Sequence, residues 1–140
     1  MRRMVLVLLA AAVTVSVAAC GILGGGTDLT SKTWQWTAAT TVSPASQSVV
    51  PNPANYTITF AADGTYAGKA DCNQIAGTYT TSGSSLTIKP GPSTLMACAS
   101  PDSLDALYVA GLLSTTQYKI EAGGLTTMNA AGDTMQFKGS

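Results

Sequence analysis

Hydrophobic and polar residues alternate along most of the chain after residue 32. Thr33-Trp34-Gln35-Trp36-Thr37 has an aromatic residue at every second position, and Tyr56-Thr57-Ile58-Thr59-Phe60 has the same period. A period of two is typical of a strand that buries one face. Pairs that favour tight turns separate the runs: Asp63-Gly64, Ser82-Gly83, Gly123-Gly124 and Gly132-Asp133. Because such pairs join antiparallel strands, the pattern predicts about seven or eight strands, mostly antiparallel.

One segment changes to a helical period. Ser100 is placed to cap a helix, Pro101 to occupy its first position, and Asp102 and Asp105 to face the positive end of its dipole. Apolar residues then follow at spacings of three and four: Leu104, Leu107, Tyr108 and Leu112. This stripe predicts a helix that covers the sheet.

Two segments lack any such period. Residues 21–31 contain glycines and polar residues and indicate a linker, so the folded domain is expected to begin near Thr33. Residues 42–55 contain Pro44, Pro51 and Pro53 among small polar residues. The three prolines predict a long exposed loop there.

The N-terminus predicts export and lipidation. Arg2 and Arg3 precede an apolar run over residues 4–17, which is shorter than the ~20 residues of a spanning helix. The run ends in Val17-Ala18-Ala19-Cys20, which matches the lipobox of bacterial lipoproteins. We therefore expect residues 1–19 to be a signal peptide, residues 20–32 to be a lipidated cysteine with a flexible tether, and residues 33–140 to be the folded domain.

Lipid on Cys20 would fix the location of the protein. Two or three acyl chains, at ~0.8 kcal/mol per buried methylene, hold a small domain stably on a bilayer. We expect a cell-envelope protein that faces outside the cytoplasm, on either the plasma membrane or the outer membrane.

Composition narrows the function classes. Without the signal peptide the chain is long enough for one compact domain, which we expect to be a monomer. Five lysines then stand against seven acidic residues, a net charge of −2, so no basic surface for nucleic acid is expected. The chain contains no histidine, which excludes Ser-His-Asp and Cys-His catalytic sets and histidine-based zinc or haem sites within one subunit. We expect no metal and no cofactor.

Two cysteines remain beside Cys20. Outside the cytoplasm such a pair most often forms a disulfide, here Cys72 with Cys98. Reactive thiols are the alternative.

The two cysteines also lie in two short motifs. These are Cys72-Asn73 with Gly77 and Tyr79, and Thr94-Leu95-Met96-Ala97-Cys98. The two motifs in this order, followed by a helix and a terminal hairpin, resemble the META domain family of HslJ-like bacterial envelope proteins. The resemblance covers roughly residues 33–138. It implies an α+β fold, here a strongly curved, barrel-like antiparallel sheet with one covering helix, and links to envelope stress, antibiotic tolerance and secretion, with no agreed catalytic activity.

The motif residues admit a structural and a functional interpretation. Gly77 fits a tight turn before Tyr79, and Asn73 can bond nearby backbone or adopt a left-handed conformation. Met96 is interpreted as a core residue. Alternatively, Asp71, Asn73 and Thr94 converge on a polar site.

Three functions follow from these features. The first is a non-enzymatic interaction or accessory module that binds an envelope protein. The second is a carrier of a small molecule or lipid, with an apolar pocket lined by Trp34, Trp36, Phe60 and Tyr66, although the Trp pair is better explained as core. The third is an enzyme, which we disfavour and for which we expect no catalytic residue, because only Asp71 and Glu121 lack an evident structural role and neither has a recognisable partner.

Overall fold

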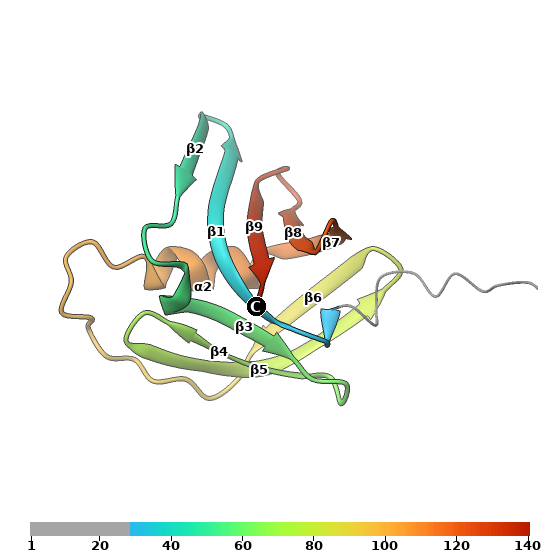
Figure 1. Ribbon diagram of the computed structural model, residues 1–140, viewed down its shortest axis with the longest axis horizontal. Helices are drawn as coiled ribbons and strands as arrows, with labels where there is room; N and C mark the ends of the chain where they lie inside the picture. Colours follow the sequence, from blue (N-terminus) through green and yellow to red (C-terminus); the bar gives the residue numbers. More distant parts are fainter. Residues whose placement is uncertain (1–28) are drawn as a thin grey trace, which may run out of the picture.

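The computed structural model describes residues 29–140, which form an antiparallel β-barrel with one helix (Figure 1). The predicted signal peptide, Cys20 and most of the predicted tether lie outside the described residues. The strands are β1 (Thr33–Val42), β2 (Ala45–Val49), β3 (Tyr56–Phe60), β4 (Thr65–Ala70), β5 (Asn73–Ser82), β6 (Ser85–Pro90), β7 (Thr115–Glu121), β8 (Gly124–Asn129) and β9 (Thr134–Gly139). The helix is α2 (Asp105–Leu113), and a short 3₁₀ turn, η1 (Pro53–Asn55), precedes β3.

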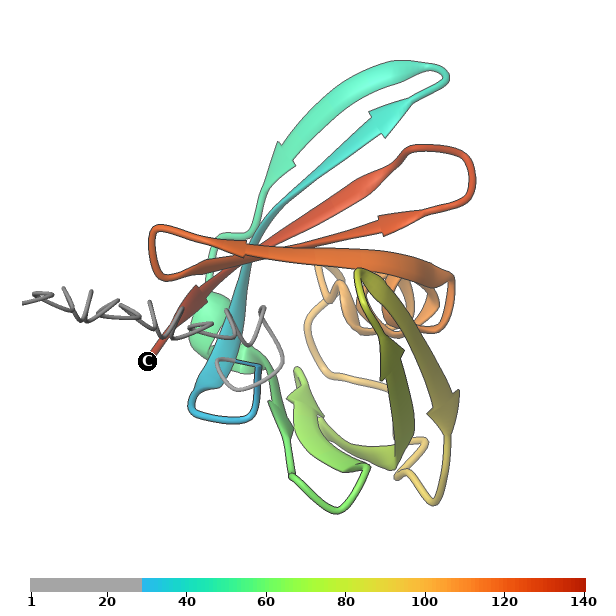
Figure 2. The same ribbon diagram turned by 90° about the vertical axis from the view of Figure 1, so that its right-hand side faces the viewer.

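The long strand β1 closes the barrel. On one side it pairs with β9. On the other side its first half pairs with β3 and its second half with β2. Eight strands therefore form a closed antiparallel barrel, with β2 as an additional strand, and the expected curved sheet with one helix is confirmed. In Figure 2 the β1–β2 and β8–β9 hairpins project from the same side of this barrel.

Local turn chemistry sets the hairpins. Gly64 has a φ of +87°, and the Asp63 carboxylate accepts hydrogen bonds from the Thr65 backbone N–H (2.9 Å) and hydroxyl (2.6 Å). The four predicted turn pairs lie at the β3–β4, β5–β6, β7–β8 and β8–β9 connections. These hairpin predictions are confirmed.

The predicted long loop over residues 42–55 is wrong. Residues 45–49 form β2, which pairs with β1 from Ala38 to Val42. Pro44 lies in the turn between the two strands, and Pro51 and Pro53 follow β2, so no proline interrupts the pairing. The segment is therefore an exposed hairpin followed by the buried residue Val50.

The helix begins later than predicted. Its first residue is Asp105, and Leu104 occupies the cap position. Ser100 caps a separate turn instead, since its hydroxyl accepts the Asp102 N–H at 3.2 Å. Tyr108 and Leu112 are buried as expected, whereas Leu107 is 55% exposed. The predicted apolar stripe is thus only partly a core face.

Aromatic residues fill the barrel. Trp36 stacks on Tyr108 at 5.4 Å between ring centroids, and Tyr56 meets both rings edge-on. Trp34 and Trp36 are 0% and 1% exposed, so the interpretation of the Trp pair as core is confirmed. Leu29 is also buried, and its carbonyl accepts the Trp34 indole N–H at 2.9 Å. The packed core therefore reaches into the segment interpreted above as tether.

Candidate functional site

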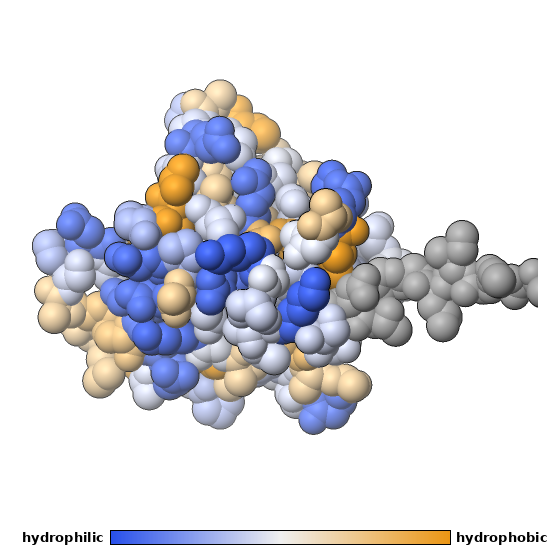
Figure 3. Space-filling model, in the orientation of Figure 1, coloured by the Kyte–Doolittle hydropathy of each residue, from blue (hydrophilic) through white to orange (hydrophobic). Residues whose placement is uncertain are grey.

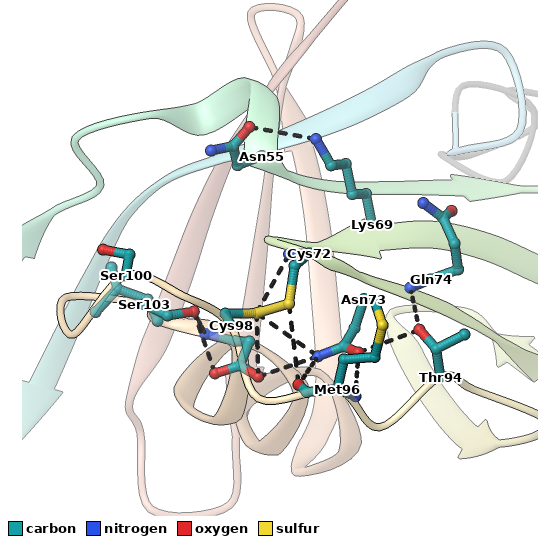
Figure 4. Close-up of a disulfide and its surroundings, with 12 residues drawn as sticks. Asn55, Lys69, Cys72, Asn73, Gln74, Thr94, Met96, Cys98, Ser100 and Ser103 are labelled. Carbon is teal, nitrogen blue, oxygen red and sulfur yellow. Dashed lines mark hydrogen bonds between the residues drawn. A yellow bond between two sulfur atoms is a disulfide. The ribbon is translucent and has the colours of Figure 1, made fainter.

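The two motifs meet at the start of β5. Cys72 lies between β4 and β5, Cys98 lies in the segment between β6 and α2, and a disulfide joins them with the Cα atoms 5.5 Å apart. Figure 4 shows Asn73, Thr94 and Met96 gathered beside this disulfide. The predicted pairing is therefore present, and it ties residues 91–104 to the barrel.

Asn73 is the centre of this arrangement. It is 6% exposed, and its side-chain oxygen accepts the Met96 backbone N–H at 2.8 Å and the Thr94 hydroxyl at 3.1 Å. Its side-chain nitrogen donates to the Met96 carbonyl at 3.0 Å and to the Asp105 carboxylate at 3.3 Å. The side-chain amide of Asn73 thus satisfies both the N–H and the carbonyl of Met96. Buried polar groups are normally hydrogen-bonded, and here the partner of the buried amide is the backbone of the neighbouring segment.

Thr94 adds a second connection to the barrel. Its hydroxyl accepts the Gln74 backbone N–H at 2.9 Å, and its own N–H donates to the Gln74 carbonyl at 3.1 Å. The chain is therefore held on both sides of Leu95, whose side chain is 94% exposed.

The interpretation of Met96 as a core residue is wrong. The residue is 58% exposed, and its backbone N–H and carbonyl are hydrogen-bonded to Asn73. Ala97, the remaining residue of the second motif, is exposed between Met96 and Cys98.

The predicted polar site is only partly assembled. Asn73 and Thr94 come together, but Asp71 lines a separate hollow of about 290 Å³ with Asn52, Asn55, Ser100 and Asp102. Asp71 has a φ of +57°, and its N–H donates to the Asn55 carbonyl at 2.7 Å. The left-handed residue of this turn is therefore Asp71, whereas Asn73 is already in β5.

The other first-motif residues have packing roles. Gly77 lies inside β5 rather than in the predicted turn, and a Cβ there would clash with the Lys89 carbonyl oxygen and approach the Tyr66 ring to 2.7 Å. Tyr79 packs edge-on against Phe60 and donates its hydroxyl to the Ala61 carbonyl at 2.6 Å. Burial raises the pKa of Tyr79, and the nearby charge of Asp63 adds to this effect.

Sequence reasoning missed Asp105 as a member of this cluster. Its carboxylate contacts Asn73 and lies 3.9 Å from the Cys98 sulfur, and its other oxygen accepts the Ser103 hydroxyl at 3.3 Å. An acidic residue at a helix start is already explained by the helix dipole, so nothing in the local sequence indicated that Asp105 would also contact Asn73. Glu121, the other carboxylate without an evident role, forms an exposed ion pair with Lys119 at 3.1 Å.

The cluster is better suited to fixing the segment 91–104 on the barrel than to catalysis or ligand binding. The Thr94 hydroxyl and both polar atoms of Asn73 are engaged in bonds to the protein itself. Within residues 29–140, no three His, Cys, Asp or Glu side chains lie close enough to share a metal ion. No helix in that same range has the length and apolar character needed to cross a membrane.

Comparison with known proteins gives the family. The META domain profile matches residues 27–140. The chain belongs to the META domain family. Among curated proteins, none matches this META domain protein.

Solved structures share the fold. An NMR structure of a protein from Burkholderia xenovorans is 22% identical with a TM-score of 0.67, covering 80% of this chain and 83% of its own. A DUF4847-family protein from Bacteroides vulgatus is 17% identical with a TM-score of 0.61, covering 79% of this chain and 93% of its own. A further NMR structure is 25% identical with a TM-score of 0.57, covering 80% and 92%. These proteins show that the fold recurs at low identity.

Proposed function

We propose that this protein is a lipid-anchored, exported envelope protein whose META domain binds another envelope protein and performs no catalysis. The lipobox at Cys20 supports the anchor, and a disulfide agrees with a location outside the cytoplasm. Because the family is linked to envelope stress and antibiotic tolerance, we propose that this binding takes part in one of those responses.

The observation that carries the proposal is the exposed Leu95 between two held residues. Thr94 and Met96 are bonded to β5 through Asn73 and Gln74, and the disulfide holds the chain two residues later. An exposed leucine on mobile chain loses conformational entropy when it binds. A leucine on a backbone that is already ordered loses less, so its burial contributes more to affinity.

A second apolar surface lies on the β1–β2 hairpin. Val42 is 51% exposed and Val49 is 76% exposed, and no residue between Lys32 and Asp63 is charged. In Figure 3 hydrophobic groups lie at the end of the molecule formed by this hairpin. Exposed apolar residues on a projecting hairpin are typical of contact surfaces.

The test is site-specific crosslinking in the cell. A photoreactive amino acid at Leu95 should capture an envelope protein as a discrete adduct. The same amino acid at Thr87, an exposed position of β6, should capture none. A Cys20→Ala background should weaken the Leu95 adduct, because the anchor raises the local concentration of membrane-bound partners.

Two results would contradict the proposal. Equal adducts from positions 95 and 87 would mean that Leu95 is not a contact residue. If Asp71→Ala abolished a cellular phenotype while Leu95→Ser left it unchanged, the polar hollow at Asp71 would be the functional site instead.

A further inference from the structure

A second hollow lies against α2, and no residue of the disulfide cluster lines it. It has a volume of about 290 Å³ and is formed by α2, the second half of β1 and the β8–β9 hairpin. Its lining is mostly apolar or small: Trp36, Ala39, Thr40, Thr41, Leu107, Ala110, Gly111, Ser114, Thr115, Thr127, Asn129, Asp133, Thr134 and Met135. Of the four residues considered above for a carrier pocket, only Trp36 lines it, and the other three belong to the filled core. We call this hollow the α2 cleft.

Packed side chains form the floor of the α2 cleft. Trp36 and Met135 are 1% and 7% exposed. Gly111 allows the Met135 sulfur to lie against the helix, since a Cβ at that position would come within 2.5 Å of it. Leu107, which the helical pattern placed in the core, instead forms an exposed apolar wall.

The charge at the rim is negative. Asp133 accepts the Val42 N–H at 2.9 Å and the Asn129 side-chain N–H at 3.1 Å. These two bonds lower the pKa of Asp133, so its carboxylate is ionised at neutral pH. Both donors are neutral, and the lining contains no lysine or arginine. The lining therefore carries one negative charge that none of its own residues neutralises.

We propose that the α2 cleft binds an organic cation with an apolar body, whose ammonium group pairs with Asp133 while the body lies on Trp36, Leu107 and Met135. A predominantly apolar lining with a small number of polar groups is the usual composition of a small-molecule site. Because liquid water takes ~30 Å³ per molecule, the volume of about 290 Å³ corresponds to a ligand of about ten non-hydrogen atoms. This site is independent of the protein contact proposed for Leu95.

The size also limits the affinity. At ~0.3 kcal/mol per non-hydrogen atom, a ligand of about ten atoms has a dissociation constant of roughly 5 mM. An exposed ammonium–carboxylate pair adds only a few-fold, and salt screens it. The experiment must therefore compare matched ligands rather than look for tight binding.

The probes are 4-phenylbutylamine and 4-phenyl-1-butanol, which differ only in the charged group. In an NMR titration of the protein with its disulfide intact, we expect the amine to shift the amide signals of Thr40, Gly111 and Thr134. We expect it to bind at least threefold tighter than the alcohol at low salt, and this preference to shrink at high salt. Equal affinities, or shifts confined to other parts of the barrel, would overturn the proposal.

Variants separate charge from shape. Asp133→Asn keeps an acceptor for the Val42 N–H but removes the charge, so the preference for the amine should disappear. Asp63→Asn, in the β3–β4 turn, should keep it. Ala110→Leu fills the cleft from the helix and should weaken both probes, whereas Ala106→Leu, exposed on the same helix outside the cleft, should weaken neither. A preference that survives Asp133→Asn, or equal effects of the two leucine variants, would place the binding elsewhere.

Discussion

Replacing Asn73 tests how much the motif contributes to stability. In Asn73→Ala the segment loses two bonds to Met96, one to Thr94 and one to Asp105. A neutral hydrogen bond contributes ~1 kcal/mol, and one to a charged group ~1.5–3 kcal/mol. Water can replace the partners on Thr94 and Met96 because both residues are exposed, which reduces the sum. We expect a loss of about 2–3 kcal/mol of the free energy of unfolding.

Urea unfolding monitored by tryptophan fluorescence measures this loss. In thermal unfolding the same loss should lower Tm by about 8–12 °C, at roughly 4 °C per kcal/mol for a domain of this size. Gln74→Ala is the matched control, because it keeps the backbone groups that bond Thr94 and removes only an exposed side chain. Its effect should stay within about 0.5 kcal/mol.

An isosteric variant adds a pH dependence. Asn73→Asp keeps the acceptor for Met96 but places a second carboxylate beside Asp105. Repulsion raises the pKa values of such a pair in the folded protein, so the variant should become more stable relative to wild type as pH falls below about 5. If Asn73→Ala cost less than about 0.5 kcal/mol, the account of the motif as a structural hub would be refuted.

Four further predictions concern other parts of the chain. Cys72→Ser with Cys98→Ser should lower stability by about 3.5 kcal/mol in the chain-entropy model, seen as a lower urea midpoint, and equal midpoints would count against it. Gly77→Ala should cost about 3 kcal/mol or more in the same assay, because the clashing Lys89 oxygen belongs to backbone that cannot yield; a near-neutral effect would contradict the close approach. The lowered pKa of Asp133 means that its contribution to stability is present above about pH 4 and is lost as pH falls further, so Asp133→Asn should flatten the acid side of a pH–stability curve. Cys20→Ala should move the protein from the detergent phase to the aqueous phase in a partition assay, and unchanged partition would exclude lipid anchoring.

Local chemistry explains which parts of the fold could be predicted. The β3–β4 turn depends on the Asp63 carboxylate, which accepts the Thr65 N–H, and on the left-handed conformation of Gly64. Because these residues are adjacent in the chain, the local sequence is enough to predict the turn. The two tryptophans are buried because their period matches one face of β1.

Errors arose where distant residues decide the structure. Pro44, Pro51 and Pro53 were interpreted as breaking a segment, but they stand on either side of β2 and leave its five residues free to pair. Gly77 is required by the Lys89 backbone and the Tyr66 ring, which no local pattern shows. The position of the prolines outside the paired residues decides the first case, and contacts with neighbouring strands decide the second.

The sequence identified two residues of the candidate site, Asn73 and Thr94, but not what they bind. The resemblance placed Asn73 and Thr94 in one motif set, but their partners are backbone groups of the neighbouring segment, which the sequence does not distinguish from other backbone. The exposure of Leu95 and Met96 follows from that arrangement. An apolar side chain carries no local signal of exposure in the sequence, so Met96 was expected in the core.

Hydrogen exchange at the Met96 amide tests the central claim most directly, that the motif holds an exposed segment in one conformation. The Met96 N–H donates to Asn73 at 2.8 Å although its side chain is 58% exposed. We predict that this amide exchanges at least ~10-fold more slowly than in an unstructured chain, and that Asn73→Ala removes the protection while amides of the barrel core keep theirs. Exchange at the unstructured rate in the wild-type protein would contradict the account.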